Sequence, residues 1–353
     1  MPGPDPPPRI PRRRGALGRR VGFSLLLLLA GLLGTEGTLR LLGWPTQQVR
    51  TMAWLLEQDP ARFAASVGVF RPSTRGRVAW PPQLAYDVQI NALGLRGEEV
   101  PPHPAPGTRR ILVLGDSGTF GFYVREDETL PARLQQLLRA EGLPVEVLNG
   151  GCGGWSIDSE TQFLEERAIG LRPHLVLLVY CSNDIADLRG PISSYEGLEL
   201  RRAAGSPLRR ALEATAVHEL AWRLKGLVRG RRPRPLTSDG LDEPERVRLW
   251  ARYEGWLARL RAFLALRGIP LVVHYQPDAW KLQNGLPATD ERELRAVCAR
   301  AGVELVSPVS AFQRHRVEET FLLPLDPHPS PLGYLLQARA LARRLQAHPR
   351  LTR

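Results

Sequence analysis

Residues 111–122 read ILVLGDSGTFGF, a short apolar run that ends in a turn carrying Asp116 and Ser117. Apolar runs of this length are typical of parallel strands that are buried on both faces of a sheet. A serine in a tight, glycine-containing turn between a strand and a helix can expose its Oγ at the top of the sheet and direct its own N–H into a site. The segment therefore predicts a buried strand with a candidate nucleophile, Ser117, at its carboxyl end.

From residue 109 onward, strand and helix patterns alternate along the chain. Further strands are expected at residues 145–148, 175–180, 270–275 and 303–306, and helices at 158–169, 243–267, 288–301 and 330–346. Leucines at positions 130, 134, 137 and 138 form one face of another helix, with Pro131 near its start and Gly142 just after its end. This alternation predicts a parallel, doubly wound α/β sheet.

Three more polar segments lie at places where such a sheet puts its ligands. LNGGCGGWS, residues 148–156, follows the second strand, and repeated glycine allows a bare N–H to approach a developing oxyanion. Asn183 and Asp184 end the apolar segment LVLLVYCSND, where an asparagine amide can donate to the same oxyanion. Asp326 and His328 precede the last helix, and a carboxylate at short range can fix the tautomer that a histidine needs as general base.

Taken together and in this order, the four segments resemble the SGNH/GDSL hydrolase family over residues 109–349. The resemblance implies a flavodoxin-like three-layer α/β/α sandwich and a serine esterase that works through an acyl-enzyme. The motifs assign Ser117 as nucleophile, His328 as its base and Asp326 as the orienting acid. The expected oxyanion hole combines Ser117, Gly154 and Asn183, and the expected supporting residues are Asp116, Asn149 and Asp184.

A segment upstream of the predicted domain extends the resemblance. INALGLRG, residues 90–97, is similar to a segment that precedes the hydrolase domain in many membrane-anchored relatives. Asn91 and Arg96 are therefore expected to support the site.

Two positions depart from the family pattern. The third block usually reads G-x-N-D, but Cys181 takes the place of the glycine. The last block usually spaces its acid as D-x-x-H, whereas Leu325 occupies that position here and Asp326 is the nearby acid. The shorter D-x-H spacing resembles that of polysaccharide O-acetylation proteins of the same superfamily. O-acyl transfer to a cell-envelope or exopolysaccharide acceptor therefore stays open beside hydrolysis.

The expected substrate is an ester on a cell-envelope glycan or lipid. A non-catalytic envelope-binding module is a further alternative, which the intact set of catalytic side chains disfavours. No metal or organic cofactor is expected, because the sequence shows neither a ligand cluster nor a nucleotide-binding loop.

The first 43 residues predict a membrane anchor. An arginine-rich stretch, residues 1–20, precedes the uncharged run VGFSLLLLLAGLLG, a pattern that places the arginines in the cytoplasm and the body of the chain outside it. No A-x-A cleavage site follows the run, and the helix can extend to Gly43 with Glu36 and Arg40 paired one turn apart. An uncleaved single-pass anchor over residues 21–43 is therefore favoured over a cleaved signal peptide.

The remaining segments complete the expected domain plan. Residues 44–107 are rich in proline and predict a juxtamembrane linker and small cap with a strand at 86–90. The hydrolase domain is expected over 108–349, with an arginine-rich insertion at 188–242 that includes a helix around 207–228. This insertion is either a surface excursion or a lid over the site, since ligands bind at the carboxyl ends of such strands.

Charge and cysteine content exclude other classes of protein. The 48 basic residues outnumber the 36 acidic ones, which gives a net charge of +12. Only Lys225 and Lys281 of the basic residues are lysine, and the sequence shows no stripe of basic and aromatic residues. Nucleic-acid binding is therefore not expected. Three cysteines are too few for a disulfide framework, and Cys181 and Cys298 are interpreted as small buried hydrophobes. A bridge from Cys152 to Cys181 is disfavoured, because another strand is expected between the strands they follow.

Overall fold

The computed structural model describes residues 14–44, 70–78, 82–189, 208, 211–212, 214–228, 238–286 and 288–352. The chain divides into two compact units, one comprising Met1–Arg50 and Pro207–Gly230 and the other Thr51–Ser206 and Arg231–Arg353. The start of the basic N-terminus, residues 45–69 and 79–81 of the predicted linker and cap, and the larger part of the predicted insertion lie outside the described residues.

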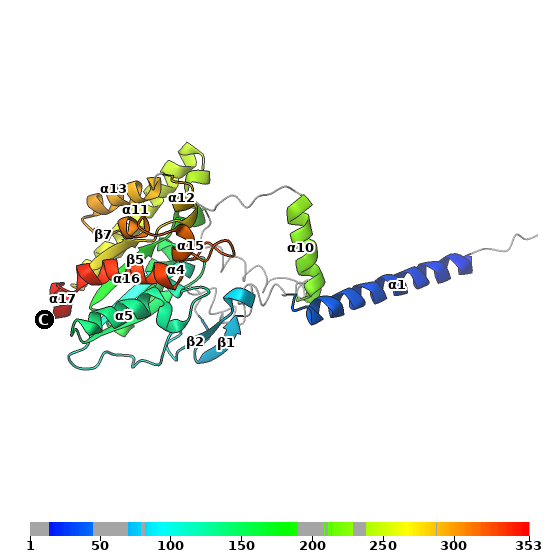
Figure 1. Ribbon diagram of the computed structural model, residues 1–353, viewed down its shortest axis with the longest axis horizontal. Helices are drawn as coiled ribbons and strands as arrows, with labels where there is room; N and C mark the ends of the chain where they lie inside the picture. Colours follow the sequence, from blue (N-terminus) through cyan, green and yellow to red (C-terminus); the bar gives the residue numbers. More distant parts are fainter. Residues whose placement is uncertain are drawn as a thin grey trace, which may run out of the picture. The chain divides into compact units, whose positions relative to one another are not determined.

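Within the described residues, the second unit is built on a five-stranded parallel sheet (Figure 1). Its strands are β3 (Arg109–Gly115), β4 (Val145–Gly151), β5 (Leu175–Tyr180), β6 (Leu271–Tyr275) and β7 (Glu304–Val306). They lie in the order β4-β3-β5-β6-β7, which is the flavodoxin-like order 2-1-3-4-5 when β3 is counted first. The chain reverses its direction of winding between β3 and β5, and ligands of such folds bind at this switch point.

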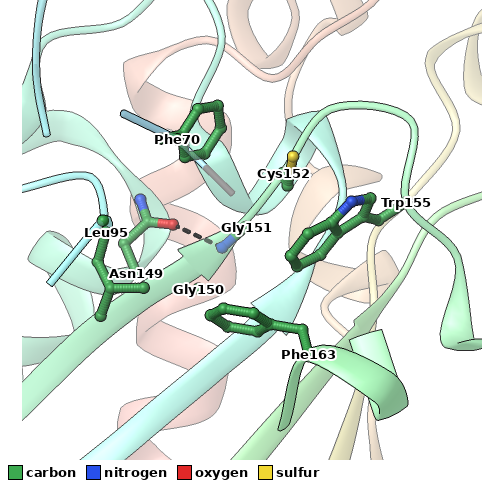
Figure 2. Close-up of a pocket in the computed structure, with 9 residues that line it drawn as sticks. Phe70, Leu95, Asn149, Gly150, Gly151, Cys152, Trp155 and Phe163 are labelled. Atoms are coloured by element: carbon green, nitrogen blue, oxygen red, sulfur yellow. Dashed lines mark hydrogen bonds between the residues drawn. The ribbon is translucent and has the colours of Figure 1, made fainter. Parts of the chain in front are cut away.

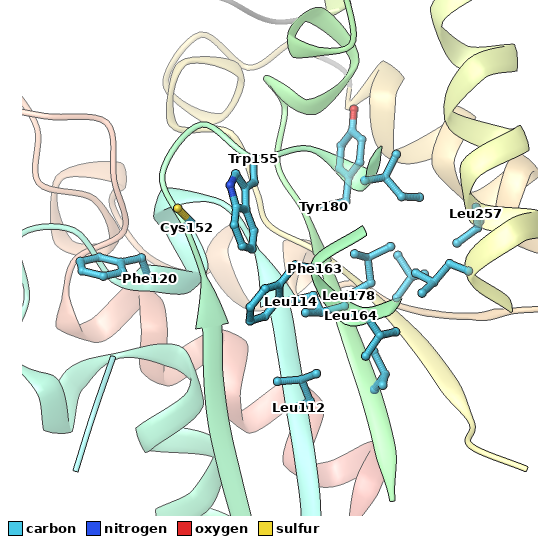
Figure 3. Packing of buried hydrophobic residues seen from close by; sticks show 14 of the residues in the cluster. Leu112, Leu114, Phe120, Cys152, Trp155, Phe163, Leu164, Leu178, Tyr180 and Leu257 are labelled. Carbon is cyan, nitrogen blue, oxygen red and sulfur yellow. The ribbon is translucent and has the colours of Figure 1, made fainter. Parts of the chain in front are cut away.

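Side chains that alternate along each strand build a hydrophobic core on each face of the sheet. Leu112 and Leu114 of β3 pack into one core with Phe163 and Leu164 (Figure 3). Ile111 and Val113 of the same strand pack into the core on the opposite face of the sheet. Because both faces are buried, the strands are apolar throughout, as the sequence predicts.

Helices cover both faces of the sheet (Figure 1). The first core takes side chains from α6 (Ile157–Glu166), α11 (Glu243–Ala265) and α13 (Thr289–Ala301), and the second from α5 (Leu130–Ala140) and α16 (Pro331–Leu345). The predicted three-layer α/β/α sandwich is therefore confirmed, with strand and helix bounds that differ from the predicted ones by a few residues. Shorter helices are α4 (Ser117–Phe120), α7 (Asp184–Asp187), α12 (Ala279–Gln283), α14 (Val309–Phe312), α15 (Val317–Thr320) and α17 (Pro349–Thr352).

A small hairpin precedes the sheet in the same compact unit. Strands β1 (Thr74–Val78) and β2 (Tyr86–Ile90) pair antiparallel, and β2 matches the strand predicted at 86–90. Single bridges then join Arg96 to Ile90 and to Asn149 of β4. The segment after β2 is therefore fixed against the edge strand of the parallel sheet.

The first unit contains α1 (Arg14–Leu41) and α10 (Ala216–Val228). Among the described residues, one helical stretch, Arg19–Leu41, is long and apolar enough to cross a membrane. The predicted pair of Glu36 and Arg40 is present, with Arg40 Nε 2.6 Å from Glu36 Oε1.

These two charges also connect α1 to the insertion. Glu36 accepts hydrogen bonds from the backbone N–H groups of Ala216 at 3.1 Å and Val217 at 3.0 Å, and Arg40 donates to the carbonyl of Ala214. The carboxylate therefore caps the N-terminus of α10. This helix starts at Ala216, where the Thr215 Oγ1 accepts the N–H of His218 as an N-cap; residues 208, 211 and 212 of the stretch predicted to be helical are helical as well.

Candidate active site

Ser117 lies at the carboxyl end of β3, at the switch point of the sheet. It is the first residue of α4, and Asp116 caps this helix by accepting the Gly118 N–H at 2.8 Å. Gly121 ends the helix with a φ of 88°, a value that favours glycine. A β-carbon on Gly151 would lie 2.2 Å from the backbone nitrogen of Phe120. Glycine at position 151 therefore lets the end of β4 pack against the nucleophile turn.

A chain of hydrogen bonds joins the three residues predicted to be catalytic. The Ser117 Oγ lies 2.8 Å from His328 Nε2, and His328 Nδ1 lies 2.5 Å from Asp326 Oδ1. The same carboxylate oxygen accepts the backbone N–H of His328 at 2.9 Å. The distances match those of a nucleophile, a base and an orienting acid.

The D-x-H spacing fits this geometry. Asp326 reaches His328 because the turn from Leu322 brings the two side chains together: the N–H groups of Leu325 and Asp326 both donate to the Leu322 carbonyl. Leu325, at the position where the family usually has its acid, is 49% exposed. Compared with the family pattern, the acid therefore lies one residue closer to the histidine in the sequence, and it still accepts a hydrogen bond from Nδ1.

Two aromatic side chains form a wall against His328, and sequence reasoning missed them. The ring centroids of Phe122 and Tyr123 lie 5.3 and 5.6 Å from that of the imidazole. Tyr123 adopts a φ of 66°, a left-handed conformation that is strained for an aromatic residue. Such a conformation persists only where the surrounding structure holds it.

Arg96 provides that support. Its guanidinium is fully buried and donates to the carbonyls of Phe120 at 2.8 Å, Gly121 at 2.5 Å and Val124 at 2.8 Å. It also pairs with Glu126 at 2.9 Å. Five N–H donors in one planar fork can satisfy several carbonyls at once, so Arg96 fixes the loop on both sides of the aromatic wall.

Asn91, the other upstream residue that the sequence singled out, shapes the loop that carries Arg96. Its Oδ1 accepts the backbone N–H groups of Leu93 at 3.0 Å and Leu95 at 3.1 Å, and its amide donates to the Glu98 carbonyl. Asn91 therefore acts on the site through the backbone of this turn.

Two residues predicted for the oxyanion hole, Gly154 and Asn183, follow the ends of two strands. Asn183 follows β5, and its Nδ2 donates to Asp116 Oδ2 at 3.1 Å and to Asp187 Oδ2 at 2.8 Å. Gly154 lies in the turn after β4 with a φ of 82°. The structure thus joins Asn183 directly to the nucleophile turn, whereas Gly154 keeps its expected role as a prediction.

The predicted supporting residues tie these segments together. Asn149 donates to the Phe120 carbonyl at 3.2 Å and accepts the Gly151 N–H at 3.0 Å, a bond that Figure 2 shows. Asp184 accepts the backbone N–H of Cys181 at 3.1 Å, and its carbonyl accepts the Ser156 hydroxyl at 2.9 Å. Each residue therefore joins two strand-end segments.

A small pocket behind the glycine-rich turn is distinct from the triad. Its lining includes the apolar side chains of Phe70, Leu95, Trp155 and Phe163, which surround the end of β4 (Figure 2). None of the three residues predicted to be catalytic lines it. The pocket belongs to the packing that supports the turn.

Cys181 is more than the small hydrophobe that the sequence predicts. Its thiol lies 2.9 Å from Asp116 Oδ1, and burial together with the neighbouring Asp116 carboxylate raises the pKa of the thiol well above its ordinary value. The thiol therefore stays protonated and donates to the carboxylate. β3 lies between β4 and β5, the strands that Cys152 and Cys181 follow, and no disulfide joins the two cysteines.

Several acidic side chains are buried beneath the nucleophile turn. Neither carboxylate oxygen of Glu160 has a hydrogen-bond partner among the described residues. Burial, followed by the charges of Asp116 and Asp158, raises the pKa of Glu160 well above its ordinary value. Burial and Glu160 raise the pKa of Asp184 in the same way. These carboxyls therefore favour their neutral forms.

The three residues predicted to be catalytic lie within the part of the chain that matches a family model. The model of the GDSL-like Lipase/Acylhydrolase family matches residues 113–336, which is more than half of the chain. No curated protein matches the chain.

Solved structures with similar folds share little sequence with this chain. A lipase/acylhydrolase from Enterococcus faecalis is 16% identical, with 67% of this chain and 95% of that chain covered and a TM-score of 0.42. An acetyl-xylooligosaccharide esterase mutant from Geobacillus Stearmophilus is 18% identical, with coverage of 67% and 94% and a TM-score of 0.40. An alpha/beta hydrolase enzyme from the metagenome of Lake Arreo, Spain, is 19% identical, with coverage of 67% and 94% and a TM-score of 0.41. By its family match, the chain belongs to the GDSL-like lipase/acylhydrolase family and is a hydrolase.

Proposed function

We propose that this chain is an extracytoplasmic serine esterase that hydrolyses an acyl ester through Ser117, His328 and Asp326. The hydrogen-bonded chain from Ser117 Oγ through both nitrogens of His328 to Asp326 carries the proposal. A serine hydroxyl is a poor nucleophile at neutral pH, and this arrangement places a base and an orienting carboxylate where they are needed.

The reaction proceeds through an acyl-enzyme. As Ser117 Oγ attacks the ester carbonyl, His328 Nε2 takes its proton, and Asp326 stabilises the imidazolium that forms. The N–H groups of Ser117 and Gly154 and the amide of Asn183 hold the oxyanion. His328 then protonates the leaving alcohol, and a water molecule activated by the same base releases the acid.

The substrate class follows from the proposed location. The arginine-rich start precedes the apolar helix α1, and basic residues flank the cytoplasmic side of membrane spans. The catalytic unit then lies outside the cytoplasm, where acyl esters occur on envelope glycans and lipids. An O-acetyl group on such a molecule is the substrate that we propose.

O-acyl transfer is the second candidate function. The D-x-H spacing of Asp326 and His328 favours it, because this spacing resembles that of polysaccharide O-acetylation proteins. A sugar hydroxyl would then replace water in the second step. Analysis of products with and without a glycan acceptor separates the two: hydrolysis yields the free acid in both cases, and transfer yields an acylated acceptor.

A fluorophosphonate probe tests the enzyme directly. We expect labelling of the full-length chain at Ser117, loss of labelling in Ser117→Ala, and normal labelling in the control Ser182→Ala, whose hydroxyl is bonded to Asp278. An unlabelled wild-type chain, or p-nitrophenyl acetate hydrolysis that survives in purified Ser117→Ala, would refute the proposed function.

The membrane topology has a separate test. A reporter fused after Arg353 should be exported, and the full-length chain should sediment with membranes. Recovery of the full chain in the soluble cytosolic fraction would show that the anchor proposal is wrong without affecting the proposed chemistry.

A further inference from the structure

Asp187 holds the amide that the proposed oxyanion hole requires, although it belongs to none of the expected motifs. Its Oδ2 lies 2.8 Å from Asn183 Nδ2, and the same nitrogen donates to Asp116 Oδ2 at 3.1 Å. An asparagine amide has two N–H groups, and here both are directed at carboxylates. A substrate oxyanion can receive an Asn183 N–H only if one of the two carboxylates gives it up.

The two carboxylates differ in how firmly they are held. Asp116 also accepts the Gly118 N–H at 2.8 Å and the Cys181 thiol at 2.9 Å, and it caps the nucleophile helix. Among the described residues, Asn183 is the sole hydrogen-bond partner of the Asp187 side chain. Releasing the N–H from Asp187 therefore disturbs less of the site than releasing it from Asp116.

Protonation is the change that weakens this bond. A carboxylate is a strong acceptor of an amide N–H, and a neutral carboxyl is a weaker one. If Asp187 were ionised, its negative charge would also lie beside the negatively charged oxyanion, because both would accept from the Asn183 amide. We propose that Asp187 is a positioning residue for the Asn183 amide, and that it acts in its protonated form, which lets the amide donate to the oxyanion.

The surroundings of Asp187 favour that form near neutral pH. Burial is the main cause that raises the pKa of Asp187 to about 7; the bond from Asn183 opposes this rise, and the charges of Asp116 and Asp158 contribute to it. Arg252 donates to the Leu188 carbonyl and to Asp158, so this guanidinium is already paired. Glu160 and Asp184 add two more buried carboxyls with raised pKa values on the same side.

A metal ion does not explain these carboxyls. No group of three or more His, Cys, Asp or Glu side chains within the described parts of the chain is arranged to hold one. The acidic cluster is better described as buried carboxyls whose charges disfavour one another's ionised forms, two of which, Asp116 and Asp187, accept from the Asn183 amide.

The pH dependence has a definite sign, and this inference rests on the proposed function. Below its pKa of about 7, Asp187 is neutral and the amide is available; above that pH it ionises and holds the N–H. We expect kcat to fall by at least about tenfold as pH rises. The fall should not exceed about 10²- to 10³-fold, which is the usual effect of losing one oxyanion donor.

The experiment compares kcat from about pH 6 to about pH 9.5 for the full-length chain in detergent with p-nitrophenyl acetate, after subtraction of spontaneous hydrolysis. Asp187→Asn keeps the size of the side chain and mimics the neutral carboxyl, so it should retain activity and lose the alkaline decline. Asp187→Ala removes the competing acceptor and should lose the decline as well. Asp87→Asn, at a side chain that is 78% exposed, is the matched control and should keep the wild-type profile.

The rate of fluorophosphonate labelling at Ser117 provides a second readout, since the phosphonyl oxygen occupies the same hole. An unchanged alkaline decline in Asp187→Asn, or a wild-type chain without one, overturns the proposal. A loss of kcat at every pH in Asp187→Asn, with labelling retained, would also overturn it by showing that the ionised carboxylate is the active form. Activity that survives in Ser117→Ala refutes the proposed function instead, so the two failures are distinguishable.

Discussion

Replacing Arg96 by methionine tests whether the segment upstream of the sheet is needed for catalysis. Methionine keeps most of the length of the arginine stem and removes all five donors. The carbonyls of Phe120, Gly121 and Val124 then lose a buried partner, and Glu126 loses its cation. The strained Tyr123 and the neighbouring Phe122 lose the support that holds them against His328.

The size of both effects follows from the burial of the guanidinium. Removing one partner of a buried ion pair destabilises a protein by about 3 to 5 kcal/mol. For a unit of this size, a change of 1 kcal/mol shifts Tm by about 2 to 4 °C, so Tm should fall by about 6 to 20 °C. A displacement of about 1 Å in the loop beside His328 should lower kcat by about 10²-fold.

Arg110 provides a matched control at the other end of β3. Its side chain is equally buried, pairs with Glu146 and donates to the carbonyls of Pro101, Pro102 and Leu171. Arg110→Met should therefore lower Tm to a similar extent and leave kcat nearly unchanged. Thermal melts and p-nitrophenyl acetate kinetics well below both transitions measure the two effects. Equal kcat for the two variants would show that Arg96 stabilises the fold without positioning the site.

Three other predictions concern the triad and the buried acids. Ser117→Ala and His328→Ala should each lower kcat by about 10⁴- to 10⁶-fold, and the double variant should be little worse, which steady-state kinetics on purified protein can check. Asp326→Asn should lower kcat by about 10⁴-fold, less than the loss of the nucleophile, because Ser117 and His328 stay in place; comparable losses would show that the acid does more than orient the base. Burial raises the pKa of Glu160 in the folded chain above its value in the unfolded chain. The stability that the neutral carboxyl contributes is therefore fully present below the pKa of the unfolded chain, and it is lost as pH rises through the pKa of the folded chain. Glu160→Gln should accordingly raise the free energy of unfolding at neutral pH by roughly 1 to 3 kcal/mol and reduce the fall of Tm with pH, and a melt series showing no gain would contradict this.

Local patterns in the sequence were enough to predict the sheet and the positions of the candidate catalytic residues. Ile111–Leu114 and residues 175–180 are apolar without interruption, which is typical of strands buried on both faces of a parallel sheet. Ser117 and Asn183 follow these strands directly, so the sheet itself brings them together at the switch point. His328 lies just before α16, which packs beside α5.

Contacts between distant segments could not be predicted in the same way. Nothing in the spacing of the chain indicates that Arg96 donates to carbonyls 24 to 28 positions further on, or that Phe122 and Tyr123 pack on a histidine more than 200 residues away. Asp187 was missed because an acid four residues after Asn183 looks like any polar position on a helix. The left-handed conformation of Tyr123 has no local sequence signal, because tertiary contacts impose it.

The upstream segment shows that amino-acid composition alone is a poor guide to where the catalytic domain begins. The proline-rich residues 101–107 predict a boundary, and the family match starts later still, at residue 113. Yet the Arg96 guanidinium lies over the Tyr86 ring, and Tyr86 contacts Tyr123 edge to face, so side chains from before the boundary hold the wall beside His328. A buried guanidinium is stable only where carbonyls and a carboxylate surround it, and the loop after Ser117 supplies both. Residues 86–97 and the nucleophile loop therefore stabilise each other, and we expect neither to keep its conformation without the other.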